Sequence, residues 1–258
     1  MTNIHYWLAN PTGNTTILIE DRFPASDYAK IAKALLDKEP MAEQAGFIED
    51  ITPHSVRLHM AGSEFCGNAS LSAAALATRK ANASNSVINV EVFGYPTPLQ
   101  AKIQYVAKDT YSGILQMPSP EDINLTSLSY ARQDYRLPLV RFPGIGHLIA
   151  TEPMDDSIAE YAIKSWCKEL NLEALGIMLL DPGNHTLRPL VYVQEIDSLY
   201  WESSCASGTC ATAAWLSLTN GIGRYDLMEP GGTLGAIVDN GMKLSLCGNV
   251  SLEEKQCS

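Results

Sequence analysis

The sequence predicts an α+β fold built from two halves that share one order of elements. Segments that alternate apolar and polar residues predict strands, and segments with apolar residues at helical spacing predict helices. In each half the order is strands, a helix, strands, a turn with a cysteine, a buried helix and further strands. This recurrence indicates a duplication of architecture, judged from pattern and not from residue identity. Chance recurrence in an ordinary α+β chain is the alternative interpretation.

The first half contains the clearest alternation of strands and helices. Ser26 or Asp27 is a plausible N-cap for its first helix, because both side chains accept hydrogen bonds from free backbone N–H groups. The expected elements are two strands in 4–21, a helix in 24–38, two strands in 44–63, a helix over 69–80 and three strands in 86–120.

The second half follows a Pro/Ser-rich run, residues 118–138, which we expect to be irregular and to contain the boundary between the halves. Three segments are therefore predicted: an N-terminal lobe over 1–120, a C-terminal lobe over 121–248, and a tail over 249–258 that returns to the N-terminal lobe. The expected elements of the second half are a strand in 141–152, a helix in 157–173, strands in 176–182 and 188–196, a helix over 207–219 and strands in 231–254.

Composition excludes several classes of protein. The chain has 258 residues, 46% of them hydrophobic, which is enough for a packed core. Its net charge of −11 argues against binding to nucleic acid or to an anionic membrane. We expect neither a secretory signal nor a membrane span, because no long apolar run is present. Six cysteines without a CxxC pair indicate reduced thiols in the cytoplasm and no metal site.

Two of these cysteines stand at the start of alanine-rich helices, in the runs SEFCGNASLSAAALAT (63–78) and WESSCASGTCATAAWL (201–216). The first turn of a helix has unpaired N–H groups and a positive dipole end. Both features stabilise a thiolate there and bind the oxygens of an anion. Cys66 and Cys205 are therefore candidate acid/base groups. A small buried hydrophobe is the alternative for either cysteine taken alone.

Small residues follow each cysteine and leave room for a ligand to approach the backbone. These are Gly67 and Asn68 in the first turn, and Ala206 and Ser207 in the second. Two such turns facing each other would grip the carboxylate of one amino acid between two sulfurs. One thiolate would then remove the α-proton, and the other thiol would return a proton to the opposite face. Neither a metal nor pyridoxal phosphate is needed for this scheme.

The turns CGNAS and CASGTCATAA resemble the two cysteine motifs of diaminopimelate epimerase and its cofactor-independent racemase relatives. NPTGNTTILI, EQAGFI, PGIGHLI and EPGGTLGAIV extend the resemblance over most of the chain. It implies two pseudo-symmetric lobes, each a curved, mainly antiparallel sheet around a central helix, and a homodimer. By the same resemblance Cys66 and Cys205 form the catalytic pair. The substrate-binding positions that it implies are Asn14, Gln44, Gly67, Asn68, Ala206 and Ser207.

Departures from the pattern of diaminopimelate epimerase limit which amino acids can be the substrate. Met60, Ile145 and Pro189 stand where diaminopimelate epimerase has asparagines, and its Glu-Arg pair is absent. The charged distal group of diaminopimelate would thus meet apolar walls, at a cost of several kcal/mol. The Cys-Gly-His turn of proline racemases is missing as well. The chain then resembles the histidine racemases of this fold, which supply D-histidine for opine metallophores.

An imidazole pocket is implied by that resemblance, because a carboxylate binds an imidazole N–H well. Solvated surface acids, and a histidine that only holds its loop, are the alternatives. Three other functions stay open: a racemase or epimerase of another amino acid, a non-catalytic amino-acid-binding protein, and an isomerase of phenazine synthesis. The paired cysteines argue against the last two. The candidates for the imidazole pocket are Glu43, Gln44, His59, His147 and Glu202.

Overall fold

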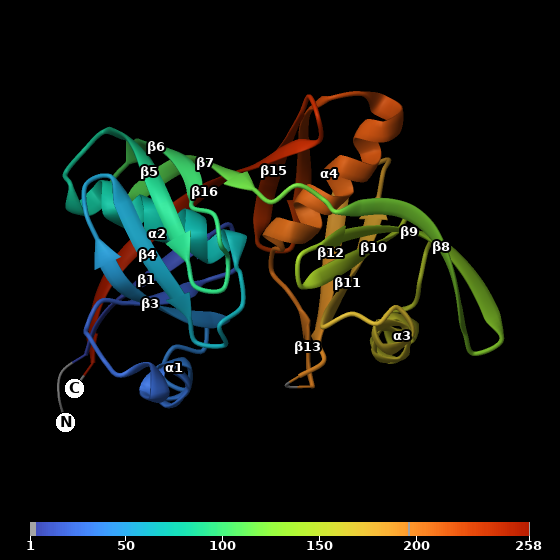
Figure 1. Ribbon diagram of the computed structural model, residues 1–258, viewed down its shortest axis with the longest axis horizontal. Helices are drawn as coiled ribbons and strands as arrows, with labels where there is room; N and C mark the ends of the chain where they lie inside the picture. The colour runs from blue at the N-terminus through green and yellow to red at the C-terminus, as the bar shows by residue number, and fades with distance from the viewer. Residues whose placement is uncertain (1–3, 196, 258) are drawn as a thin grey trace. The chain divides into compact units, whose positions relative to one another are not determined.

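The computed structural model describes residues 4–195 and 197–257. Ile196, the last residue of a predicted strand, and Ser258, the last of the predicted tail, lie outside the described residues, as do residues 1–3. The chain forms two compact units: unit 1 comprises Met1–Gln116 with Leu246–Ser258, and unit 2 comprises Met117–Ser245. Each unit combines strands and helices (Figure 1), which confirms the α+β class.

Unit 1 follows the predicted order of strands and helices closely. Its elements are β1 (Ile4–Pro11), β2 (Thr16–Ile19), the 3-10 turn η1 (Ala25–Asp27), α1 (Tyr28–Leu36), β3 (Gln44–Ile51), β4 (Ser55–Met60), α2 (Gly67–Lys80), β5 (Asn85–Val92), β6 (Leu99–Ala107), β7 (Thr110–Met117) and most of β16 (Lys243–Cys257).

The sheet of unit 1 closes around a buried helix. Its strands run in the order β1-β2-β3-β4-β5-β6-β7-β16, and β16 also pairs with β1 in an antiparallel register from Ile4↔Cys257 to Pro11↔Val250. Helix α2 contacts β1 to β6, and every residue from Gly67 to Thr78 is buried. Alanine and serine make up half of this helix, which lies among the strands of unit 1 (Figure 1).

Unit 2 contains the second predicted set of elements. They are β8 (Asp122–Tyr130), β9 (Gln133–Phe142), β10 (Ile145–Ala150), α3 (Asp156–Glu169), β11 (Ala174–Asp181), β12 (Thr186–Val193), β13 (Ser198–Trp201), α4 (Ala206–Asn220), β14 (Gly223–Glu229), β15 (Gly232–Asp239) and the first residues of β16.

The connections in unit 2 repeat those of unit 1. In unit 1, α1 links the parallel pair β2 and β3, and α2 links the parallel pair β4 and β5. In unit 2, α3 links the parallel pair β10 and β11, and α4 links β12 to β14, which pair in parallel. Helix α4 contacts β9, β10, β11, β14 and β15 and so occupies the same central place as α2.

The other two helices pack on their sheets through aromatic side chains. On α1, the ring of Tyr28 stacks on Phe47 of β3 with centroids 3.6 Å apart. On α3, Trp166 is fully buried and belongs to a cluster with Leu128, Leu139 and Ile177. No helix among the described residues is both long and apolar enough to cross a membrane.

The prediction of an irregular run over 118–138 is wrong. The hairpin of β8 and β9 occupies it, with Tyr130 paired to Gln133. Strand β8 exposes most of its side chains, so its apolar residues show no clear alternation. The two turn residues, Ala131 and Arg132, have φ of 51° and 67°. Such tight turns are expected from glycine or asparagine, so this sequence gave no hairpin signal.

Three smaller features also differ from expectation. Asp27 is at the N-cap position of α1, but it has helical φ and ψ and its side chain makes no capping hydrogen bond, because η1 precedes it. Strands β13 and β14 were not predicted. Strand β13 has four residues and buries none of them, and β14 buries only Leu227 and Glu229, so neither shows an apolar alternation.

Candidate functional site

Cys66 is the N-cap of α2 and uses its sulfur as the cap. Its backbone is extended, with φ −130° and ψ 115°, and the N–H of Ala69 donates to Sγ at 3.4 Å. The Ser70 hydroxyl donates to the Cys66 carbonyl at 2.7 Å. In most helices a side-chain oxygen of Ser, Thr, Asp or Asn accepts this capping hydrogen bond. The sulfur therefore lies where the free N–H groups and the dipole of α2 favour negative charge.

A chain of polar side chains leads to the Cys66 sulfur. Gln44, the first residue of β3, donates from Nε2 to Sγ at 3.1 Å. The same Nε2 contacts Asn14 Oδ1, and Asn14 Nδ2 donates to Glu43 Oε2 at 2.7 Å. The structure thus brings Asn14, Glu43 and Gln44 together beside Cys66. Gly67 and Asn68 are buried in the first turn of α2, while Cys66 itself is partly exposed.

Cys205 is the N-cap of α4 with nearly the same backbone, φ −127° and ψ 106°. Its sulfur receives no capping hydrogen bond from α4, and it is buried with 5% exposure. Ser207 Oγ lies 3.7 Å from Sγ. A Cβ on Gly208 would overlap Met178 Sδ and lie 3.2 Å from Cys205 Sγ. A side chain at this position would therefore force the end of the Met178 side chain on β11 to move.

His147 lies behind the second turn and is completely buried. Its Nε2 is 2.9 Å from Ser207 Oγ. Burial lowers the pKa of His147 to about 3, so the ring is neutral near pH 7. It faces Gly176 in the paired strand, where any Cβ would overlap the ring. His147 therefore acts on the turn through Ser207, in accord with the interpretation that it holds its loop.

Two carboxylates lie close to the Cys205 turn. Glu229, at the end of β14, accepts a hydrogen bond from the Cys205 backbone N–H at 2.7 Å and contacts the Thr209 hydroxyl. Burial raises the pKa of the Cys205 thiol well above its usual value. The charge and hydrogen bonding of Glu202 raise it further, as does charge on Glu229. The Cys205 turn is thus built to hold a proton on sulfur.

Comparison with known proteins identifies the family. The sequence model described as "Histidine racemase CntK N-terminal domain" matches residues 3–254. The chain belongs to the histidine racemase family. A histidine racemase of Fusobacterium nucleatum (strain ATCC 25586) is 35% identical over 90% of this chain and 87% of its own length. A histidine racemase of Staphylococcus aureus (strain Mu50) is 27% identical over 87% of this chain and 85% of its own length.

Solved structures support the fold alone. A predicted epimerase from Pseudomonas aeruginosa has a TM-score of 0.71 at 12% identity, covering 99% of this chain and 98% of that chain. A hydroxyproline epimerase from Agrobacterium vitis has a TM-score of 0.68 at 10% identity, covering 98% and 92%. These matches confirm the predicted fold class and the resemblance to the epimerase and racemase fold.

The predicted site residues fall into two groups in this histidine racemase family member. Ala206, the first residue of α4, is buried like Gly67 at the same place in α2. Glu202 lines a pocket of about 210 Å³ in unit 2 with Arg188, Pro189, Trp201, Ser203 and Pro230. The first group is Cys66, Asn14, Glu43, Gln44, Gly67 and Asn68, and the second is Cys205, His147, Glu202, Ala206 and Ser207.

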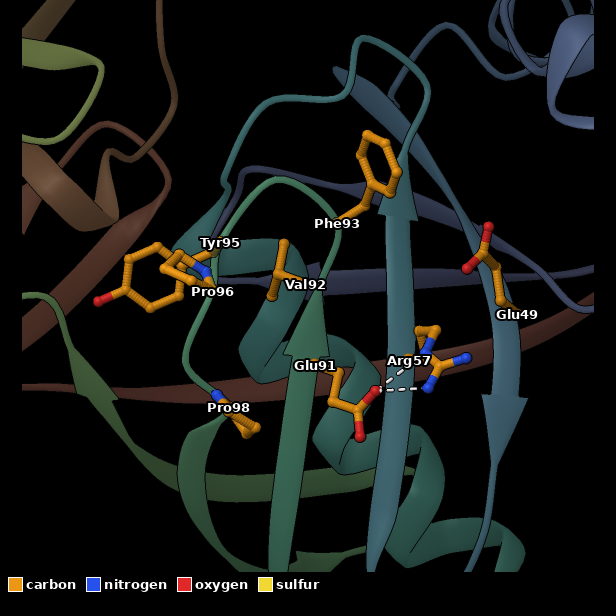
Figure 2. Close-up of a pocket in the computed structure, with 8 residues that line it drawn as sticks. All are labelled: Glu49, Arg57, Glu91, Val92, Phe93, Tyr95, Pro96 and Pro98. Carbon is orange, nitrogen blue, oxygen red and sulfur yellow. Dashed lines mark hydrogen bonds and ion pairs between the residues drawn. The ribbon is translucent and has the colours of Figure 1, made fainter.

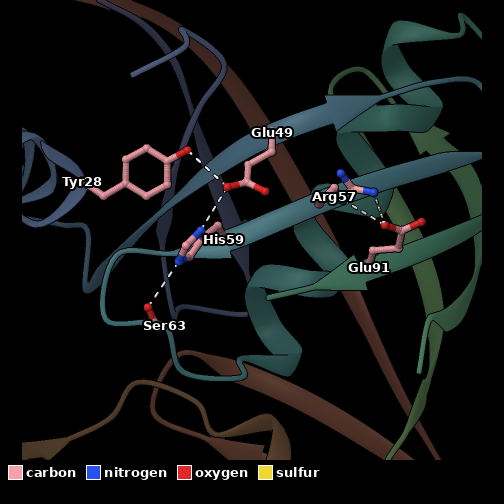
Figure 3. Close-up of polar contacts among 6 residues, drawn as sticks. All are labelled: Tyr28, Glu49, Arg57, His59, Ser63 and Glu91. Atoms are coloured by element: carbon pink, nitrogen blue, oxygen red, sulfur yellow. Dashed lines mark hydrogen bonds and ion pairs between the residues drawn. The ribbon is translucent and has the colours of Figure 1, made fainter. Parts of the chain in front are cut away.

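His59 belongs to a different cluster from the other candidates for the imidazole pocket. Its Nδ1 is 3.0 Å from Glu49 Oε1, and its Nε2 is 3.2 Å from Ser63 Oγ (Figure 3). The ring stacks on Phe93 with centroids 3.8 Å apart, and Tyr28 donates to the same Glu49 oxygen. These contacts fasten the loop between β4 and α2 and explain why His59 is 7% exposed.

A second pocket lies on the strands beside that cluster. It measures about 230 Å³ and is open on the surface formed by β3, β4 and β5 (Figure 2). An exposed ion pair between Arg57 and Glu91, with N and O 2.7 Å apart, lies along it. Its lining residues are Glu49, Arg57, Glu91, Val92, Phe93, Tyr95, Pro96 and Pro98, so the predicted site residues are not part of it.

Sequence reasoning missed Glu229 and Thr209. Glu229 precedes the Pro-Gly-Gly segment, where an acidic residue is ordinarily a solvated turn residue. It is instead 4% exposed. Thr209 lies four residues after Cys205 within a run of small residues, where its hydroxyl gives no sign of a partner on another strand. Within the described residues, no group of three or more His, Cys, Asp and Glu is arranged to hold a metal ion.

Proposed function

We propose that this chain interconverts L- and D-histidine, with Cys66 and Cys205 as the acid/base pair and without pyridoxal phosphate or a metal. Membership of the histidine racemase family supports the substrate. The observation that carries the mechanism is the recurrence of one turn, a cysteine N-cap with extended backbone at the start of a buried helix. A two-base reaction needs one such group for each face of the α-carbon.

Cys66 is the resting base in this proposal. Its sulfur accepts hydrogen bonds from the Ala69 N–H and from Gln44 Nε2. Hydrogen bonds to the charged form favour that form, as does the helix dipole. The thiolate takes the α-proton, an S–H bond forms, and the electron pair of the broken C–H bond moves onto the substrate carboxylate.

Cys205 is the resting acid. Burial and the carboxylate of Glu202 hold its proton. The S–H bond breaks as a new C–H bond forms on the other face of the α-carbon, which leaves Cys205 as the thiolate. In the opposite direction the two cysteines exchange roles, so each turn must tolerate both states of its sulfur.

The backbone around the cysteines binds the substrate carboxylate. The first-turn N–H groups of α2 and α4, at Gly67, Asn68, Ala206 and Ser207, are the donors in this proposal. They also take up the negative charge that develops on the carboxylate when the α-proton leaves. Small side chains at three of these four positions allow the close approach.

Carboxylates account for the choice of an imidazole side chain. Glu43 is fixed by Asn14 beside Cys66, and Glu202 lines the pocket beside Cys205. Either oxygen set accepts an imidazole N–H, and a carboxylate nearby also favours the protonated ring. A cytoplasmic location, a homodimer and a place in metallophore synthesis stay predictions from the sequence.

One experiment tests the proposal directly. The purified protein, kept reduced, is incubated in D₂O with each L-amino acid, and loss of the α-proton is followed by NMR together with circular dichroism. We expect exchange and racemisation with histidine, unchanged by EDTA or by a pyridoxal scavenger. Exchange with another amino acid but not with histidine would overturn the substrate, and exchange with none would overturn the racemase.

A further inference from the structure

Glu229 is held by the Cys205 turn on both of its oxygens. Oε2 accepts from the Cys205 backbone N–H at 2.7 Å, and Oε1 contacts Thr209 Oγ1. The hairpin that follows Glu229 is tied to the same segment, because the Gly231 N–H donates to the Ser203 carbonyl at 2.7 Å. The end of β14 therefore fixes the chain on both sides of its entry into α4.

The contacts of the Thr209 hydroxyl indicate whether Glu229 carries a proton. Its Oγ1 is 2.8 Å from the Cys205 carbonyl oxygen and also contacts Glu229 Oε1. A hydroxyl has one proton, and a carbonyl oxygen can only accept. If Thr209 donates to the Cys205 carbonyl, Glu229 must donate to Thr209. The Cys205 carbonyl already accepts the Thr209 backbone N–H at 2.8 Å, so the point at issue is the Thr209 hydroxyl. If Glu229 is a carboxylate, one of the two close oxygen contacts of Oγ1 has no proton, whereas a carboxylic acid supplies a proton to each contact.

Burial favours the same protonation state. Glu229 is 4% exposed, and no cation neutralises it in the part of the chain that the structure describes. The titratable groups that face it are Cys205 at the start of α4 and Glu202 before it. The neighbouring strand β15 presents Gly232 opposite it. Burial raises the pKa of Glu229 to about 8 even though the hydrogen bonds with Thr209 and the Cys205 backbone N–H lower it, and the charge of Glu202 adds to the rise.

We propose that Glu229 is a positioning residue that works as a neutral carboxylic acid beneath the Cys205 turn. It orients the Cys205 backbone and adds no fixed negative charge beside the sulfur. This inference rests on the proposed function, in which Cys205 must become a thiolate in one direction of the reaction. A carboxylate at Glu229 would oppose that state, so its ionisation lowers activity at alkaline pH.

The first test is Glu229→Gln, because an amide reproduces the neutral acid. Its oxygen accepts from the Cys205 N–H, and its NH₂ donates to Thr209 Oγ1. Glu229→Ala removes both hydrogen bonds. A hydrogen bond contributes about 1 kcal/mol, and a buried donor left without a partner costs more, so we expect kcat to fall about tenfold or more. Glu229→Gln should restore most of that loss and remove the decline in kcat near pH 8.

The second test is independent of histidine turnover. Protein stability is measured by denaturant unfolding from pH 5 to 8.5, and the carboxylic acid C=O band is sought by infrared spectroscopy. The inference is supported if the stability of the wild type falls as pH rises towards 8 and the carboxylic acid band is present. Both the fall and the band should be absent in Glu229→Gln. The exposed Glu152→Gln serves as the matched control and should behave as wild type.

The outcomes separate the two proposals. Glu229→Gln that folds but is as slow as Glu229→Ala overturns the neutral acid, because a charge would then be required. Equal pH slopes in wild type and Glu229→Gln overturn it too. If the wild type exchanges no α-proton, the racemase proposal fails, and the stability and infrared data alone decide the state of Glu229.

Discussion

The two cysteine turns share a backbone but surround their sulfurs differently. Both cysteines cap a buried, small-residue helix from an extended conformation. At Cys66 the neighbours donate: Gln44 Nε2 at 3.1 Å and the Ala69 N–H at 3.4 Å. At Cys205 the neighbours are the carboxyl groups of Glu202 and Glu229 and the Ser207 hydroxyl, and the sulfur is buried. The same backbone turn thus places one sulfur among hydrogen-bond donors and the other in a buried setting that raises the pKa of its thiol.

This difference shows how a duplicated scaffold acquires two chemical roles. The helix N-terminus alone would lower the proton affinity of both sulfurs. Side chains from neighbouring strands decide the outcome: the first residue of β3 donates to one sulfur, and the end of β14 supports the other turn. The connection order of the strands, which is the same in both units, places different residues at equivalent points.

Loss of either sulfur should have the largest effect. Cys66→Ser and Cys205→Ser are each expected to lower racemisation by about 10²–10⁴-fold, because a serine hydroxyl is a poor acid or base near pH 7. Cys257→Ser, which changes a partly exposed thiol on β16, is the matched control. Interconversion at the wild-type rate by either catalytic variant would exclude the two-base scheme.

Gln44→Leu tests the difference between the two turns at Cys66. It removes the donor to a thiolate, and a hydrogen bond to a charged group contributes about 1.5–3 kcal/mol, so kcat/KM should fall about 10–100-fold. The acidic limb of the pH profile should move to higher pH, since the thiolate loses stabilisation. A uniform loss at every pH would show that Gln44 only shapes the pocket.

Gly176→Ala tests the support of the Cys205 turn. The new Cβ would overlap the buried His147 ring, and overpacking costs about 1–3 kcal/mol of stability. Displacement of His147 should also disturb Ser207 and lower kcat. Gly183→Ala, in an exposed turn where a Cβ would lie 3.3 Å from Asp181 Oδ1, should change stability by less than about 0.5 kcal/mol. Equal effects of both changes would argue against this packing role.

His147 gives a pH dependence of stability opposite in sign to that of Glu229. Its folded pKa of about 3 lies below the unfolded value of 6.5, so the unfolded chain binds the proton between these values. Stability is lost as pH falls from 6.5 to 3, by at most about 1.4 kcal/mol per pH unit. His147→Gln should remove this slope, as denaturant unfolding from pH 3 to 7 would measure.

The pH dependence of stability that Glu229 causes has the opposite sign. Its folded pKa of about 8 lies above the ordinary 4.5, so the folded chain retains a proton that the unfolded chain has lost. That stability is present below pH 4.5 and is lost as pH rises to 8. Between pH 4.5 and 6.5 the two slopes oppose each other. The free energy of unfolding of a variant with both His147→Gln and Glu229→Gln should not depend on these two groups in that range. Comparison with each single variant then assigns each slope to its residue.

Prediction from sequence succeeded where local pattern carries the information. The buried helices α2 and α4 follow from runs of small apolar residues after Cys66 and Cys205, and most strands follow from alternation. It failed for the β8–β9 hairpin, because Ala131 and Arg132 give no turn signal and β8 is largely exposed. The stacking of His59 on Phe93 could not be predicted either, because it is a long-range contact.

The amino-acid sequence by itself determined the α+β class, the repeated order of elements and the two cysteine N-caps, since these depend on neighbours within a few residues. The tertiary structure alone decided what surrounds each sulfur. Gln44 lies 22 residues from Cys66 along the chain, and Glu229 lies 24 residues from Cys205. Strand pairing brings such residues together, and burial then sets which of them holds a proton, because desolvation depends on everything packed around the group.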